Sequence, residues 1–209
     1  DALVLAQLLR CEYLPPVWRP DPETRELRAL TTRRSVLVSD RTRLKNRLHS
    51  VLHQRLIAAP ADLFGLRGRA WLGTVALDEI GRAQLDSDLK LLAAVERELD
   101  ALEAQLVPRA RRDERVALLM TLPGVDFTVA QTLLAALGDV ARFRDGDHAA
   151  SYLGIVPSTR QSAEHCYHGP ITKHGSGHAR WLLVQAAQHL DCHPGPLGVF
   201  FRRLLRKKS

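Results

Sequence analysis

Apolar side chains along the first half of the chain recur every seven residues. Between residues 23 and 57, one position of the repeat is apolar four times in succession, at Leu30, Leu37, Leu44 and Val51. The second position is held by Leu27 and Leu48, and Arg34 and Arg41 interrupt it. Because a seven-residue period aligns these side chains along one face, it predicts a long helix that packs on a partner helix.

A second helix of the same kind is predicted from about residue 72 to 106. Its repeat consists of Leu85, Leu92, Leu99 and Leu106, with Val95 and Leu102 between them. The segment between the two helices, "AAPADLFGLRGRAW", contains Pro and Gly, which interrupt helices. The pattern favours an antiparallel coiled-coil hairpin over residues 23–108. Pairing of either helix with another copy of the chain stays open.

The remaining segments predict short helices and polar connections. Residues 1–10 form an apolar helical pattern, and a proline-rich linker extends to residue 22. Residues 109–209 predict a small helical domain with a Pro-Gly turn, a polar loop from residue 155, and a basic helix at the end. We therefore expect an all-α fold in three parts, 1–22, 23–108 and 109–209. No apolar run reaches the roughly 18–20 residues that span a bilayer. The few, widely spaced cysteines favour a cytoplasmic protein.

Positive charge is concentrated in two clusters. The 209 residues carry a formal net charge of +7. Eight basic residues against two acids lie between Arg25 and Arg47, and "RRLLRKKS" ends the sequence. Clusters of one sign in a basic protein favour a nucleic-acid partner, although charge runs are often only solvated faces. The candidate nucleic-acid contacts in these clusters are Arg33, Arg34, Arg41, Arg43, Lys45, Arg47, Arg202 and Arg203.

The sequence "TLPGVDF" predicts a tight turn between two helices. Such a turn resembles the helix-hairpin-helix module, in which backbone N–H groups hold a DNA phosphate, here beside Gly124. Asp126 stands where that module usually has a second glycine. A carboxylate repels phosphate, so the hairpin has the alternative role of a packing device.

The polar segment "IVPSTRQSAEHCYHGPITKHGSGHAR" contains the remaining candidate chemistry. Its serines are Ser158, Ser162 and Ser176, and a nucleophilic serine needs nearby groups that stabilise the developing charge. Its histidines and Cys166 match no standard zinc spacing, so ordinary polar loop residues are favoured over a metal site. The three cysteines of the chain are widely spaced and are interpreted as reduced thiols.

Three consecutive motifs resemble one family. "LMTLPGV", "AASYLGIVPSTRQSA" and "GPITKHGSGHARWLLVQAA", from about Val116 to Ala187, are similar to the C-terminal domain of the one-ten (one-sixteen/nine-oh-two) family of insertion-sequence transposases. The N-terminal half of this chain also resembles the family, because the pattern from Leu27 to Leu48 is similar to the linker between the family's domains. Members of that family are DNA recombinases that are guided by a structured bridge RNA and work as oligomers.

The resemblance implies specific roles for two residues. Ser162 corresponds to the serine that attacks a DNA phosphodiester, and Asp1 to the last of four acidic residues that bind Mg²⁺ in a RuvC-like domain. It also implies that the chain is a fragment that lacks most of that domain and is inactive alone. DNA, bridge RNA and a second copy, joined through the coiled coil, are the implied partners, and the location is the prokaryotic nucleoid.

Four further residues complete these expectations. Arg160, Lys173 and Arg180 flank Ser162 and are expected to contact phosphate and offset its charge. Ala163 follows the serine where the family usually has glycine. Two alternatives stay open: a non-catalytic nucleic-acid-binding coiled-coil protein, and a structural oligomer whose charge is incidental.

Overall fold

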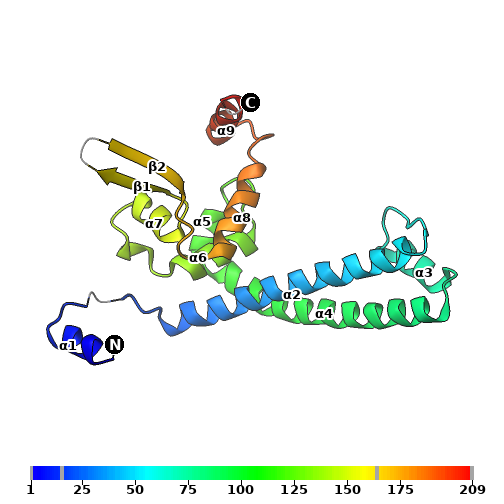
Figure 1. Ribbon diagram of the computed structural model, residues 1–209. Helices are drawn as coiled ribbons and strands as arrows, with labels where there is room; N and C mark the ends of the chain where they lie inside the picture. The colour runs from blue at the N-terminus through cyan, green and yellow to red at the C-terminus, as the bar shows by residue number, and fades with distance from the viewer. Residues whose placement is uncertain (1, 15–16, 163–164, 208–209) are drawn as a thin grey trace.

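The computed structural model describes residues 2–14, 17–162 and 165–207. The chain is mostly helical, with one two-stranded sheet (Figure 1). In chain order the elements are α1 Ala2–Arg10, α2 Pro22–His53, α3 Leu66–Thr74, α4 Glu79–Arg112, α5 Glu114–Leu119, α6 Phe127–Leu137, the 3-10 helix η1 Val140–Arg142, α7 Gly146–Leu153, β1 Pro157–Ser162, β2 His165–Ile171, α8 Gly177–Gln188 and α9 Pro196–Arg206.

The helices α2 and α4 lie side by side and run in opposite directions (Figure 1). Their apolar seam is buried as the heptads predict, in clusters that include Leu37, Leu44 and Leu48 from α2 and Leu92 and Leu99 from α4. The α2 seam is therefore covered within the chain. Supercoiling of the pair, and pairing with another copy, stay predictions.

Ion pairs between the two helices report the same antiparallel alignment. Arg34 contacts Glu103 at 2.7 Å, and Arg109 contacts Glu26 at 2.6 Å. A third pair joins Arg47 to Asp88 nearer the far end of the hairpin. Arg34, which interrupts the leucine repeat, thus lies beside α4 and pairs with it.

The ends of the long helices differ from the sequence-based boundaries. The segment predicted as one helix from residue 72 is divided between α3 and α4, because the chain is extended at Val75 and α4 begins only at Glu79. At its other end α4 continues through Pro108 to Arg112. The expected division at residues 108 and 109 therefore falls inside a helix, and the division of the chain into three parts stays a prediction.

Helix α6 forms the centre of the second half of the chain. Eight of its eleven residues are buried, which fits a helix surrounded by neighbours on all sides. It packs against α2, α5 and α8. Arg28 on α2 donates hydrogen bonds to the carbonyl oxygens of Ala135 and Ala136, at 2.5 and 2.8 Å, so a cation occupies the negative end of the α6 dipole.

The strands β1 and β2 are an exception in a chain that otherwise fits the expected all-α fold. They form an antiparallel hairpin in which Thr159 pairs with His168 and Ser162 with His165, inside the segment predicted as a loop. Nearly every residue of both strands is exposed, and polar residues occupy both faces. The alternation of apolar and polar residues that identifies a half-buried strand is therefore absent, which is why the sequence pattern missed the hairpin.

The two terminal helices are largely exposed. No residue of α1 is buried, and Gly198 is the only buried residue of α9 among those that the structure describes. Figure 1 shows α9 beyond the C-terminal end of α8. Within the described ranges, no helix is long and apolar enough to cross a membrane.

Candidate functional site

Ser162 lies at the end of β1 that is farther from the helical body. It is exposed, and its hydroxyl makes no hydrogen bond with any residue that the structure describes. The hairpin projects from the helices with this end pointing away from α8 (Figure 1). A serine in this position is accessible to a large substrate such as a DNA backbone. Ala163, where the family usually has glycine, lies outside the described residues.

Arg160 lies on the same strand, two residues before Ser162. Alternate residues of a strand share a face, so the two side chains project to the same side of the hairpin. Directly across the ladder from Arg160 is Tyr167, which is 67% exposed. Tyr167 is not among the residues predicted from the sequence, where its only signal is an aromatic residue between Cys166 and His168.

The polar residues of the other hairpin face interact with one another. The ring nitrogen Nδ1 of His168 lies 3.1 Å from the hydroxyl of Thr159, and its Nε2 lies 3.8 Å from the sulfur of Cys166. No group of three or more His, Cys, Asp or Glu side chains that could hold a metal ion occurs in the described part of the chain. The first contact joins the two strands, and the second joins neighbouring residues on one face of β2.

Mg²⁺ has no binding site among the described residues. The family resemblance assigns a ligand role to Asp1, which lies outside them, and they contain no group of three or more His, Cys, Asp or Glu side chains that could hold a metal ion. The residues present therefore do not fit the ion, and no chemical step of this chain is assigned to it.

Lys173 and Arg180 lie at the opposite end of the hairpin from Ser162. Pro157 pairs with Ile171 at the base of the ladder, and Lys173 follows two residues later. The length of β1 separates base and tip by roughly 17 Å. The exposed Lys173 adopts a positive φ of 57°. The structure thus brings Arg160 to Ser162 but leaves Lys173 and Arg180 at the base.

Arg180 is bound to backbone carbonyls. Its Nη1 lies 3.0 Å from the oxygen of Leu153, 2.5 Å from that of His174 and 3.3 Å from that of Gly175. The guanidinium therefore connects the start of α8 with the end of α7 and the segment after β2.

Most of the predicted basic contacts on α2 already interact within the chain. Arg34 and Arg47 pair with acids of α4, Arg43 pairs with Asp40, and Lys45 lies 4.8 Å from the ring centre of Phe64. By contrast, Arg33 is exposed and makes no ion pair with the described residues, and Arg41 is half-buried. Arg33 is therefore the residue of this set most open to a phosphate.

The basic residues of α9 divide in the same way. Arg202 donates hydrogen bonds from Nη1 to the carbonyl oxygens of Asp191 and His193, at 2.5 and 3.1 Å, which fixes the turn before α9. Arg203 is exposed and makes no such bond within the described residues. Arg202 and Arg203 are adjacent, so they form a natural pair for comparing structural and binding roles.

The Pro-Gly turn contacts α8. Gly124 has a φ of 79°, and a Cβ atom built there would collide with the carbonyl oxygen of Ala186. Asp126 accepts a hydrogen bond from the backbone N–H of Val129 at 2.8 Å, so the carboxylate occupies the N-terminus of α6. The turn thus packs closely on α8, and the N–H of Val129 at the start of α6 is bound by a carboxylate of the same chain, so both observations favour the packing role.

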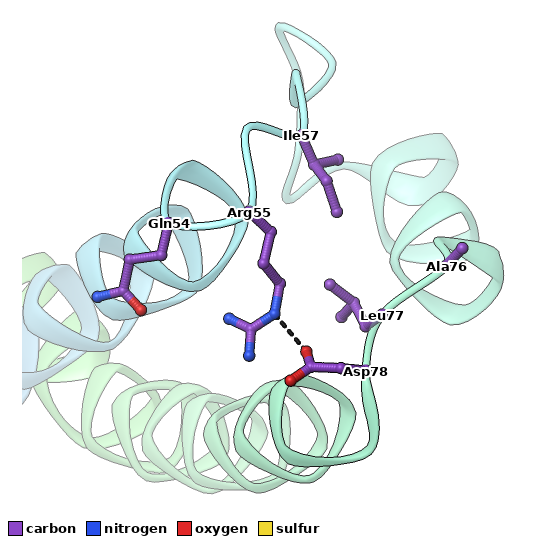
Figure 2. A pocket seen from close by; sticks show the side chains of 6 residues that line it. All are labelled: Gln54, Arg55, Ile57, Ala76, Leu77 and Asp78. Atoms are coloured by element: carbon purple, nitrogen blue, oxygen red, sulfur yellow. Dashed lines mark hydrogen bonds and ion pairs between the residues drawn. The ribbon is translucent and has the colours of Figure 1, made fainter.

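A cavity of about 610 Å³ lies far from Ser162, at the end of the α2–α4 hairpin. Figure 2 shows Arg55 reaching across it to Asp78, at 2.5 Å. This hydrogen bond holds the pKa of Asp78 below its ordinary value and raises that of Arg55. The guanidinium also covers Gly81, where a Cβ would lie 2.5 Å from it. The cavity contains none of the predicted site residues, and its ion pair closes the end of the hairpin.

Comparison with known proteins gives two family matches. A model described as the IS116/IS110/IS902 transposase family matches residues 116–196, which include β1, β2 and α8. A second model, of the DEDD transposases of IS110 elements and described as a transposase, matches residues 1–57.

Relatives with curated descriptions agree with these matches. The chain is 27% identical over 246 residues to the insertion element IS116 44.8 kDa protein of Streptomyces clavuligerus, covering 94% of the chain and 61% of the relative. It is 32% identical to a probable family 20 transposase of Pseudomonas aeruginosa, covering 74% and 47%. It is 36% identical to the insertion element IS110 43.6 kDa protein of Streptomyces coelicolor, covering 75% and 38%.

The chain spans about half the length of these relatives. The family matches at both ends, together with the relatives' descriptions, support its assignment to the IS110/IS116/IS902 family of transposases.

Proposed function

We propose that this chain, as part of a longer transposase, holds DNA and supplies Ser162 as the nucleophile for strand cleavage and exchange. The observation that carries the proposal is the position of Ser162, exposed at the hairpin tip inside the segment that matches the family model. Arg160 lies on the same face of the strand, and we expect it to offset charge on an attacked phosphate. The resemblance adds a structured guide RNA, Mg²⁺ bound outside the described residues, and assembly of several copies.

The proposed step is a transesterification. The Oγ of Ser162 forms a bond to phosphorus while the bond from phosphorus to one DNA oxygen breaks. The hydroxyl proton leaves to a base, and the departing DNA oxygen takes up a proton. Attack on the phosphoserine by a hydroxyl of another DNA end reverses these changes and rejoins the strands. Because each step exchanges one phosphodiester for another, no energy source is required.

Substitution of Ser162 in the full-length protein tests this proposal. We expect Ser162→Ala to abolish both strand exchange and the covalent protein–DNA adduct seen on a denaturing gel, while DNA binding stays unchanged. The matched control is Ser158→Ala, on the same strand and closer to its base, which should retain both products. Strand exchange that survives Ser162→Ala would show that another group is the nucleophile.

A non-catalytic role in nucleic-acid binding is the second candidate, and it is favoured by the exposed Arg33 and Arg203. Replacing Arg33 with Gln should reduce the slope of log affinity against log salt by about 1. Arg34→Gln is the matched control. Because Arg34 pairs with Glu103 inside the chain, its replacement is expected to lower stability and not the salt slope. A salt-independent affinity of the unchanged chain would exclude binding through phosphates.

A further inference from the structure

The base of the β1–β2 hairpin is a closed backbone junction. The N–H of Thr172 donates to the carbonyl of Val156 at 3.0 Å, and the N–H of Lys173 donates to that of Gly154 at 3.1 Å. The two segments that join the hairpin to the helices are therefore held beside each other. This arrangement continues the strand pairing one step toward α7.

Two glycines allow the segments to approach this closely. Gly154 caps α7 with a φ of 71°, and a Cβ there would collide with the backbone of His174. Gly175 also has a φ of 71°, and a Cβ there would collide with the carbonyl oxygen of Tyr152. Any other residue at either position would add strain from the positive φ as well as this overlap.

Arg180 binds both sides of this junction. One of its acceptors, the oxygen of Leu153, belongs to the last turn of α7, while those of His174 and Gly175 belong to the segment entering α8. Carbonyls at the end of a helix lack partners inside that helix, so a guanidinium satisfies them and stabilises the bend. Its half-buried side chain and its three acceptors fit a structural bond better than a surface phosphate contact.

We propose that Arg180 is a positioning residue: it fixes the direction in which the hairpin leaves the helical body and thereby places Ser162. The consequence for catalysis rests on the proposed function, whereas the role of Arg180 in the junction does not. A two-stranded hairpin with both faces exposed has little apolar burial to hold it in place. Its orientation therefore depends on the bonds at its base, of which those of Arg180 are the only ones made by a side chain of α8 among the described residues.

Hydrogen exchange on this 209-residue chain tests the junction without any assay of activity. Arg180→Gln should increase the exchange rates of the Thr172 and Lys173 amides by about tenfold or more, and leave those of α2 and α4 unchanged. Arg180→Lys keeps the charge, but its nitrogen falls one bond short of the position of Nη1, so exchange should stay fast. Lys173→Gln, which removes an exposed charge next to the junction, is the control and should leave exchange slow.

The longer protein tests the consequence for catalysis. A positioning role predicts a lower kcat for strand exchange at unchanged KM for DNA in Arg180→Gln, without rescue by Arg180→Lys. A phosphate contact predicts a higher KM, a smaller salt slope and rescue by lysine, and this result would overturn the inference. Unchanged amide exchange in Arg180→Gln, or loss of protection throughout α2 and α4, would also overturn it. If Ser162→Ala stays active, the proposed function fails while the exchange result still decides the junction.

Discussion

The indole of Trp18 lies directly against Gly138, at the residue where the chain leaves α6. Gly138 has a φ of 68°, and a Cβ built there would run into the indole ring. The guanidinium of Arg142 lies 4.1 Å from the ring centre of Trp18 on one side, and that of Arg28 lies 5.4 Å away. Trp18 thus anchors the proline-rich segment to the second half of the chain through cation–π contacts.

Gly138→Ala should destabilise the chain by about 1–3 kcal/mol, because alanine adds both a strained positive φ and overlap with the indole of Trp18. Chemical denaturation followed by circular dichroism measures this difference. The control is Gly146→Ala, where a Cβ meets nothing within 4 Å and no positive φ is involved. A loss of stability as large in the control would mean that the Trp18 contact is not the cause.

Leu92→Ala should lower the free energy of unfolding by about 2–5 kcal/mol, because Leu92 is 1% exposed in the seam between α2 and α4 and its removal leaves a cavity. Its neighbour Leu91 is 49% exposed, so Leu91→Ala should change stability by less than about 1 kcal/mol. Urea titration of both variants gives the comparison. Equal effects would show that the seam is not packed as described.

Asp126→Ala should destabilise the chain by about 1 kcal/mol, since its carboxylate caps α6 through the N–H of Val129. If the turn is a packing device, removal of this negative charge leaves the affinity for duplex DNA unchanged. Fluorescence anisotropy with a short labelled duplex measures that affinity. A clear gain in affinity for Asp126→Ala, or for Asp126→Gly, would instead assign the turn to phosphate binding.

The stability of the chain should fall as the pH decreases from about 7 through the ordinary pKa of histidine, in part because of His178. Burial, and secondarily the positive charge of Arg34, lower the pKa of His178 below 6.5. In this range the unfolded state binds more protons than the folded state, so acidification favours unfolding. Thermal melts between pH 7 and pH 5 should show a weaker pH dependence for His178→Gln. An identical dependence in both proteins would exclude this contribution.

The two long helical segments could be predicted from the sequence because their signal is regular. Seven-residue spacing identifies a buried seam from residue type alone, and leucines such as Leu85 and Leu92 lie there. The hairpin of β1 and β2 gave no comparable signal, because neither face is buried and no apolar alternation results. The residues that mark this hairpin in the sequence are Gly154 and Gly175, whose positive φ permits the close approach of the two backbone segments at its base.

The role of each basic residue was less predictable than the presence of the basic clusters. Arg34 and Arg180 are both arginines in polar surroundings, yet one pairs with Glu103 and the other binds three carbonyls. Glu103, the partner of Arg34, is distant in the sequence. The three carbonyl acceptors of Arg180 are brought together by a local bend that composition does not encode. Charge counts therefore overestimated how many of these residues are free for nucleic acid.

The antiparallel alignment of α2 and α4 also limits how this protein can change length. Inserting residues into one helix alone would shift the leucine seam and separate Arg47 from Asp88. Paired insertions of seven residues in both helices keep every contact in phase and lengthen the hairpin by about 10 Å each time. The distance between α3 and the body that holds Ser162 should therefore vary among related proteins in discrete steps of one heptad rather than continuously.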